Sequence, residues 1–147
     1  MSEKTQSLTD AIKQEISADS VIDSTKLDLE SLKITKLQSK WIIKHAELLR
    51  LQRQMENKKA KVVKSLTLYY LGKASDETYK NKPLNHKILK SDLSTWLEAD
   101  DLYIEIHEAS HDIAIALSAT EMFLKDLSQR SFNIRNAIEY RKFQAGV

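Results

Sequence analysis

The most regular pattern of apolar positions in this chain lies between residues 27 and 69. An apolar or aromatic residue recurs there at every seventh position, and most of these residues are followed directly by a second apolar one. The repeating positions are Leu27, Ile34, Trp41, Leu48, Met55, Val62 and Tyr69. No Gly or Pro interrupts the stretch. A sustained seven-residue repeat of this kind predicts one long helix with an apolar seam along one side.

The ends of this helix are predicted at about residues 24 and 71. Thr25 and Asp28 resemble a capping box at its start, and Gly72 suits the left-handed position that follows a helix end. Such a helix would be about 69 Å long at its usual rise, whereas a compact domain of this chain length is about 40 Å across. We therefore expect the helix to bend, or the molecule to be elongated, with the seam covered by a hairpin partner or by other subunits.

The rest of the chain also predicts helices and no convincing strand. Residues 72–90 collect Gly, Asp, Asn, Lys and the only Pro, which predicts a partly disordered loop. Two amphipathic helices follow, at about 91–129 and 131–144, with a bend near Arg130. Residues 1–20 are either a short helix or an arm that orders on a partner. The predicted fold is all-α, an elongated helical hairpin with a C-terminal amphipathic helix, forming one domain over residues 21–147.

Charge changes this picture, because the seam helix is strongly basic. Between Lys33 and Lys64 the chain has ten Lys or Arg residues against only Glu47 and Glu56, although the whole chain is nearly balanced at 23 basic and 21 acidic residues. The first half of the following helix is acidic, which favours its antiparallel pairing with the basic one. A helix surface this one-sided favours binding to a polyanion. The alternative is a solvated basic face on a structural coiled-coil oligomer that does not bind DNA.

Composition excludes several other classes of protein. The absence of Cys excludes a disulfide scaffold and Cys-ligated zinc, and it fits a reducing compartment. The two Gly residues stand at 72 and 146, so no Gly-rich phosphate loop is present. No apolar stretch is long enough to predict a membrane span or a signal peptide. We expect a soluble intracellular protein that has no cofactor and does not bind a membrane.

One short motif suggests metal chemistry. His107-Glu108-Ala109-Ser110-His111 matches the H-E-x-x-H pattern, which places two imidazoles one helical turn apart for zinc and a Glu as general base. A zinc hydrolase is therefore a second alternative. It would also need a third ligand, a substrate-binding sheet and a cleft, none of which the sequence predicts. We expect no metal site, no catalytic residue and no enzymatic activity.

The aromatic residues have two interpretations. Trp41 and Trp96 are able to stack on nucleic-acid bases, but Trp41 lies on the apolar seam, which favours packing. Tyr69, Tyr70 and Tyr79 flank the basic helix end and the following loop, where either role is open.

Four motifs resemble a known family when they are taken together and in order. They are Val21-Ile22-Asp23-Ser24-Thr25-Lys26-Leu27, then Ser39-Lys40-Trp41 with Lys44-His45, then Leu68-Tyr69-Tyr70 with Gly72, and finally Arg130-Ser131-Phe132 with Arg141, Phe143, Ala145 and Gly146. In this arrangement the chain resembles the UvsY recombination mediators of T-even-type phages over roughly residues 8–147.

The resemblance implies a non-enzymatic accessory factor in the cytoplasm of an infected bacterial host. Its partners would be single-stranded DNA, a phage RecA-like recombinase and the phage single-strand-binding protein, and it would help the recombinase to load on coated strands during recombination and repair. It also implies a ring-like, open-barrel homo-oligomer, a hexamer or heptamer, assembled through the C-terminal region.

The resemblance and the charge pattern together give two sets of candidate residues. Those for DNA binding are Lys58, Lys59, Lys61, Lys64 and Lys73, and those for oligomerisation are Phe132, Ile134, Ile138 and Phe143. The family has a basic pair just before the tyrosines. Lys64 matches its first member, but Leu66 occupies the position of the second.

Overall fold

The computed structural model describes residues 7–147, and every element within them is helical. The described chain divides into two compact units. Unit 1 contains the described residues up to Arg50 together with Asp112–Val147, and unit 2 contains Leu51–His111. The two long helices, α2 (Leu27–Tyr70) and α5 (Asp101–Ala145), contribute residues to both units.

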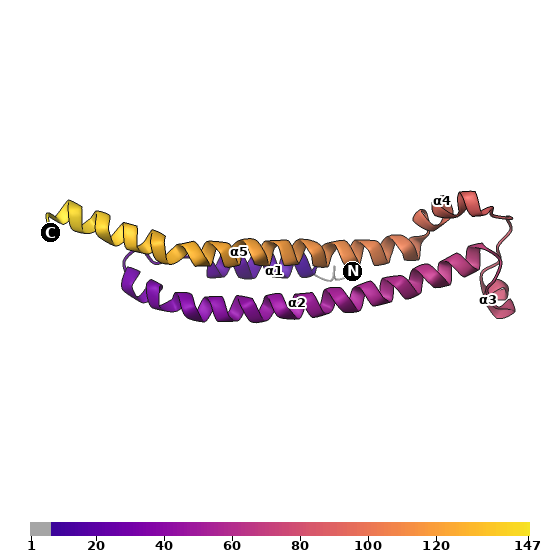
Figure 1. Cartoon of the computed structure of the whole chain (residues 1–147), viewed down its shortest axis with the longest axis horizontal. Helices are drawn as coiled ribbons and strands as arrows, with labels where there is room; N and C mark the ends of the chain where they lie inside the picture. The colour runs from indigo at the N-terminus through magenta and orange to yellow at the C-terminus, as the bar shows by residue number, and fades with distance from the viewer. Residues whose placement is uncertain (1–6) are drawn as a thin grey trace, which may run out of the picture. The chain divides into compact units, whose positions relative to one another are not determined.

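Unit 1 is built from three helical segments. α1 (Leu8–Asp19) lies beside the first part of α2 and the second part of α5 (Figure 1). Trp41 is completely buried, and its ring meets that of Phe123 edge to face at 5.0 Å. Leu27 and Ile34 pack with Ile134 further along α5, so α2 and α5 run antiparallel within this unit. The predicted seam is the buried edge of α2 here.

Polar contacts hold α1 in unit 1. The buried Arg130 donates from Nη1 to the carbonyl of Asp19 at 3.2 Å and from Nη2 to that of Ser20 at 3.3 Å, where α1 ends. The Asp19 carboxylate accepts from Lys40 Nζ at 2.6 Å and from Trp41 Nε1 at 2.9 Å. Burial alone would raise the pKa of Asp19, but these two donors outweigh burial and lower it.

Unit 2 is organised around the end of α2. Gly72 has a positive φ of 74°, its amide donates to the carbonyl of Tyr69 at 3.1 Å, and the amide of Lys73 donates to that of Leu68 at 2.8 Å. This pair of bonds is the Schellman motif, which satisfies the last carbonyls of the helix. Leu66, Tyr69 and Tyr70 form the buried core of the unit, against side chains from α3 (Asp76–Asn81), from α4 (Leu93–Glu98) and from the segment between them.

Asp100 joins α4, α5 and the tyrosine core. Its carboxylate accepts from the hydroxyl of Tyr70 at 2.6 Å and caps the start of α5 by accepting from the amides of Leu102 and Tyr103 at 2.9 and 3.3 Å. Burial would raise the pKa of Asp100, but these donors outweigh burial and lower it. Burial and the neighbouring carboxylate raise the pKa of Tyr70 in turn.

Several predictions can now be compared with the structure. The all-α class is confirmed, and α1 corresponds to the short helix, one of the two alternatives left open for residues 1–20, of which residues 1–6 lie outside the described residues. The loop at 72–90 is not wholly irregular, because Ser75 caps the short helix α3 and Lys90–Asp92 form a 3₁₀ turn. The single domain predicted over 21–147 stays a prediction beside the two compact units.

The helix break was predicted at the wrong place. α5 runs unbroken from Asp101 to Ala145, through the bend expected near Arg130. The residues there include neither Gly nor Pro, and the Arg130 side chain is used to bind the end of α1. The break lies instead at Ala99–Asp100, where the carboxylate of Asp100 caps a new helix.

Replacing Tyr70 by Phe should destabilise the protein, because it leaves a buried carboxylate without its hydroxyl donor. We expect the free energy of unfolding to fall by about 1.5–3 kcal/mol at neutral pH, the usual value for a hydrogen bond to a charged group. The folded pKa of Asp100 is lowered, so its contribution is complete above the unfolded pKa and is lost as the pH falls through the folded one. In urea unfolding, the difference in unfolding free energy between the original protein and Tyr70→Phe should therefore become smaller as the pH falls. Tyr140→Phe, which changes an exposed tyrosine, is the control.

Candidate nucleic-acid interface

The cations on α2 fall into two groups with different partners. Three of those in unit 1 lie beside acids: Lys33 is 3.0 Å from Glu30, Lys40 is 2.6 Å from Asp19, and Lys44 contacts Glu15. Because these charges are matched within the unit, they add little attraction for an anion. The basic character predicted for Lys33–Lys64 is therefore partly neutralised at its N-terminal end.

The predicted DNA-binding lysines lie in unit 2 and are not matched in this way. Lys58, Lys61, Lys64 and Lys73 are exposed, and Lys59 is half-buried. None of the five forms an ion pair within 4.0 Å of another residue in 7–147. The sequence from Asn57 to Ser75 contains no acid at all. Unit 2 thus presents uncompensated positive charge along the end of α2.

The helical period places some of these side chains in one row. Arg53, Asn57, Lys61 and Lys64 follow each other in steps of four, four and three residues, which keeps them on one face of a helix, and all four are exposed. We call these four residues the basic stripe. Lys58 lies three residues from Lys61 at its edge, whereas the half-buried Lys59 is on the inner side. The sequence-based list did not include Arg53, whose guanidinium is 3.4 Å from the carboxylate of Glu56, so its charge is partly matched.

The structure explains why residue 66 is not basic. Leu66 is 7% exposed and packs with Tyr69 and Tyr70 in the core of unit 2. Lys64 lies two residues earlier, which places it on the opposite side of the helix. A cation at position 66 would enter the core in this chain, so the basic stripe depends on Lys61 and Lys64, with Lys58 beside them.

The predicted oligomerisation residues are divided between two faces of α5 in unit 1. Ile134 is 3% exposed and packs with Leu27 and Ile34, and Ile138 packs against the same cluster. Phe132 and Phe143 are 51% and 80% exposed. They are eleven residues apart, which returns to the same face of a helix. The first pair therefore stabilises unit 1 itself, and the second pair is available to a partner.

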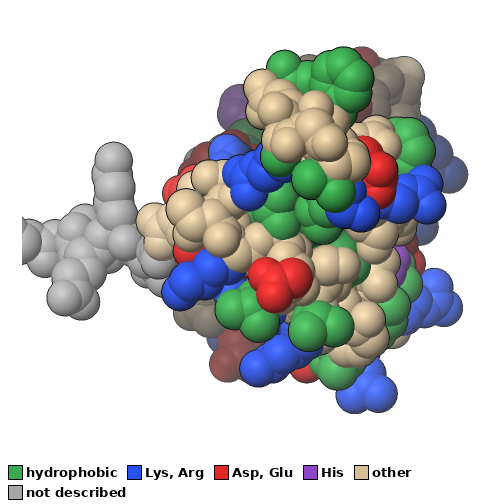
Figure 2. All heavy atoms as spheres, turned by 90° about the vertical axis from the view of Figure 1, so that its left-hand side faces the viewer, with side chains coloured by type: hydrophobic (Ala, Val, Ile, Leu, Met, Phe, Trp, Pro, Cys, Tyr) green, Lys and Arg blue, Asp and Glu red, His purple; other side chains and the backbone are tan. Residues whose placement is uncertain are grey.

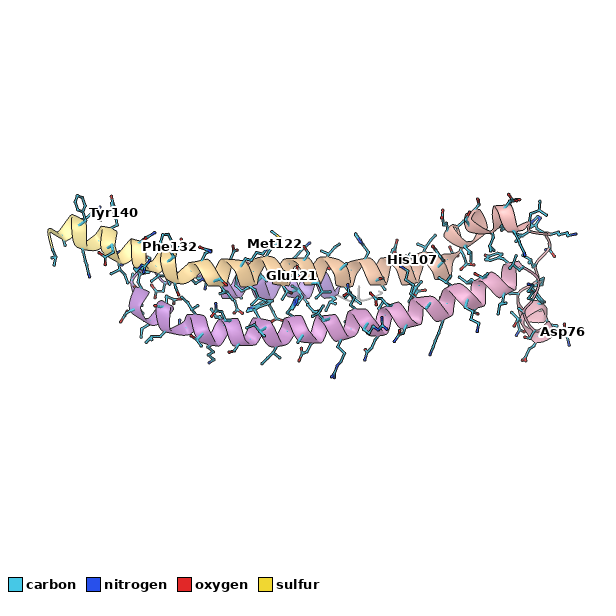
Figure 3. The ribbon with its side chains drawn as sticks, in the orientation of Figure 1. Asp76, His107, Glu121, Met122, Phe132 and Tyr140 are labelled. Carbon is cyan, nitrogen blue, oxygen red and sulfur yellow. The ribbon has the colours of Figure 1, made fainter. Side chains whose placement is uncertain are left out.

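Three exposed aromatic side chains, Phe132, Tyr140 and Phe143, lie in the last part of α5. Figure 2 looks onto the part of unit 1 that contains the C-terminus, and hydrophobic side chains are exposed there beside Lys and Arg. Tyr140 is 62% exposed and projects from α5 away from α2 (Figure 3). An aromatic surface of this kind is typical of protein–protein contacts.

In the described residues, the H-E-x-x-H stretch has no third metal-ligating side chain beside it. The ring of His107 stacks on that of Tyr103 at 3.9 Å, and its Nδ1 donates to the carbonyl of Tyr103 at 2.9 Å. His111 is exposed. Within residues 7–147, no three His, Asp or Glu side chains are grouped closely enough to hold a metal ion. In the same residues, no helix is both long and apolar enough to cross a membrane.

Comparison with known proteins agrees with the family resemblance. The model of a family described as the recombination, repair and single-stranded DNA binding protein UvsY matches residues 15–147. The recombination protein UvsY of Enterobacteria phage T4 is 27% identical over 135 residues, which are 92% of this chain and 96% of that protein. The resemblance predicted from the four motifs is confirmed.

Solved structures agree as well. Two crystal forms of the bacteriophage T4 recombination mediator protein UvsY align with TM-scores of 0.78 and 0.79, both at 27% identity. The first alignment covers 92% of this chain and 96% of the solved chain, and the second covers 91% and 98%.

Leu66→Lys should destabilise unit 2 and should not strengthen an interaction with nucleic acid. The substitution removes a buried apolar side chain and places an ammonium among the tyrosines, so we expect the free energy of unfolding to fall by about 2–5 kcal/mol. Thermal unfolding would measure this loss. Ser65→Lys adds the same charge at the neighbouring exposed position and should unfold like the original chain. Equal stability of the two variants would contradict the position given to Leu66.

Proposed function

The chain belongs to the UvsY family of recombination, repair and single-stranded DNA binding proteins. On that premise we propose that it binds single-stranded DNA through the basic stripe and helps a RecA-like recombinase to load on coated strands. The family consists of non-enzymatic recombination mediators, so the chain is not an enzyme. The proposal therefore concerns binding, competition and assembly.

One observation supports DNA binding above the others. Lys58, Lys61 and Lys64 are exposed along α2 without an acidic partner among the described residues, whereas three of the four lysines of α2 in unit 1, Lys33, Lys40 and Lys44, are paired with acids. Flexible cations along a helix suit phosphate oxygens, which repeat regularly in any strand. Contacts from these lysines to phosphates carry no sequence information, so the binding they give is independent of sequence.

A few phosphate contacts per subunit give only weak binding at physiological salt. Several subunits on one strand multiply the effect, because each bound site raises the local concentration of the strand at the next. We therefore propose a homo-oligomer, a hexamer or heptamer as the sequence resemblance implies. The exposed aromatic surface of Phe132, Tyr140 and Phe143 supports a contact between copies.

The proposed mechanism of loading is a competition between two states of the strand. In one state the strand follows the single-strand-binding protein, and in the other it follows the stripes of several subunits. Each contact is individually weak, so segments of strand exchange readily and become accessible to the recombinase. Contacts to the recombinase and to the coating protein would hold all three proteins on the same strand.

Changing Lys58, Lys59, Lys61 and Lys64 together to Ala should weaken binding to single-stranded DNA and reduce its dependence on salt. If each lysine meets one phosphate, the slope of log affinity against log salt should become shallower by about 2.8 per subunit. Fluorescence anisotropy with a labelled oligonucleotide at several salt concentrations measures both effects. The same variant should no longer speed the loading of a recombinase on coated strands.

A matched control removes the same charge elsewhere. It replaces four exposed lysines of unit 1 that form no ion pair with another described residue, namely Lys13, Lys26, Lys36 and Lys125. This control should keep most of the affinity and of the salt slope. Equal losses in both variants would mean that net charge, and not the basic stripe, determines binding.

Phe143→Asp should disrupt the oligomer and leave the helical fold intact, because the side chain is 80% exposed and contributes little to unit 1. Placing a carboxylate in an apolar contact between copies is unfavourable. Analytical ultracentrifugation should show smaller species at unchanged helicity. Gln144→Glu adds the same charge at the next residue without removing an aromatic ring and should sediment like the original protein. An unchanged oligomer in the Phe143 variant would remove this residue from the assembly surface.

A further inference from the structure

A cavity of about 520 Å³ opens in unit 2 beside the end of α2. Its walls include Tyr70, Gly72 and Tyr79 on one side and Leu84, His86 and Lys87 on the other. The lining therefore combines aromatic and aliphatic surface with one lysine and no acid. Apart from its chain neighbours, no atom of residues 7–147 lies within 4 Å of the position that a Cβ of Gly72 would take, so there is open space beside this glycine.

One lining residue of this cavity, His86, forms an exposed aromatic pair with Trp96, which lies next to the lining residues His86 and Tyr70. The rings of His86 and Trp96 are 5.4 Å apart, and that of Trp96 is 6.1 Å from Tyr70. Trp96 is 37% exposed, in contrast to the fully buried Trp41. Within residues 7–147, His86 forms no side-chain hydrogen bond or ion pair that would fix it in another role. The pair offers stacking surface that the fold itself leaves in contact with water.

Positive charge surrounds the same cavity. Lys87 is part of the lining, and Lys73 follows Gly72 directly and is exposed. Neither lysine forms an ion pair with another described residue. Lys64, at the end of the basic stripe, precedes Gly72 by eight residues, which is about 12 Å along a helix. A strand held on the stripe therefore comes within a few nucleotides of the cavity.

We propose that this cavity accepts a base of the bound single strand, stacked against His86 and Trp96, with Lys87 and Lys73 beside the flanking phosphates. The inference rests on the proposed function and adds a second kind of contact to it. Stacking on aromatic side chains tolerates any base, because every base has an aromatic face. A free nucleotide is a poorer match, since the cavity has no loop of glycine amides to surround a polyphosphate.

The first test compares two strands with the same phosphates. One is an oligothymidylate, and the other has the same length but lacks alternate bases. We expect the strand with missing bases to bind about 5- to 100-fold more weakly, the effect of losing one stacked base per site. Binding of the thymidylate should also change the tryptophan fluorescence. Trp41 is buried, so the change should come from Trp96 and disappear in Trp96→Phe.

Variants of the two aromatic residues provide a second test, in which each variant is measured with both strands. His86→Ala should weaken binding of the thymidylate and have little effect on the strand with missing bases, and so should Trp96→Ala. His86 is exposed, so its variant remains informative even if the loss of Trp96 perturbs the core. Leu89→Ala removes an exposed apolar side chain of the same unit outside the cavity lining and should bind both strands like the original protein.

The outcomes separate this inference from the proposed function. Salt-dependent DNA binding with equal affinity for both strands and constant fluorescence would overturn the base pocket and leave the basic stripe in place. Absence of DNA binding altogether would overturn both. If the His86 variant bound DNA normally but no longer bound the recombinase, the cavity would belong to a protein segment, and the inference would be wrong.

Discussion

The seven-residue spacing of apolar side chains on α2 is the constraint on which the structure depends. It requires one side of the helix to be buried along its whole length, and each unit meets this requirement in its own way. In unit 1 the seam packs against α1 and α5 around Trp41, and in unit 2 it ends in the cluster of Leu66, Tyr69 and Tyr70. Because the apolar residues occupy one side, the cations of α2 lie at its edges or on the opposite face.

Neighbouring acids then decide which of these cations can bind an anion. α1 provides Glu15 and Asp19 to Lys44 and Lys40, so the positive charges of these two lysines are matched inside unit 1. No acid of the described chain lies within ion-pair distance of Lys58, Lys61 or Lys64. In unit 2 the buried carboxylate of Asp100 bonds to Tyr70 and to backbone amides. A chain with almost balanced charge thereby obtains a local positive surface.

Much of this was predictable from the sequence, since periodicity and capping are local properties. The seam predicted the long helix, and its spacing could also have indicated that Leu66 is buried, because that residue precedes Tyr69 by three positions and follows Val62 by four. The helix α3 was missed, although Ser75 followed by two acids is a helix-start pattern. The partners of Arg130 were not predictable, because they are carbonyls more than a hundred residues away in the chain. That contact explains why a polar stretch continues as helix where a bend was expected.

The two faces of α5 show why the sequence alone did not separate core residues from candidate assembly residues. An amphipathic pattern identifies apolar residues, but it does not tell which of them a chain buries itself and which it leaves for another copy. Ile134 and Phe132 differ by only two positions, yet the first is 3% exposed and the second 51%. Likewise Trp41 and Trp96 are both able to stack on a base, and only their burial, 0% against 37% exposed, distinguishes a core residue from an accessible one. The proposed functional surfaces of this protein are therefore what remains after its own core is complete: unpaired lysines on α2, uncovered aromatics on α5, and the open aromatic cavity of unit 2.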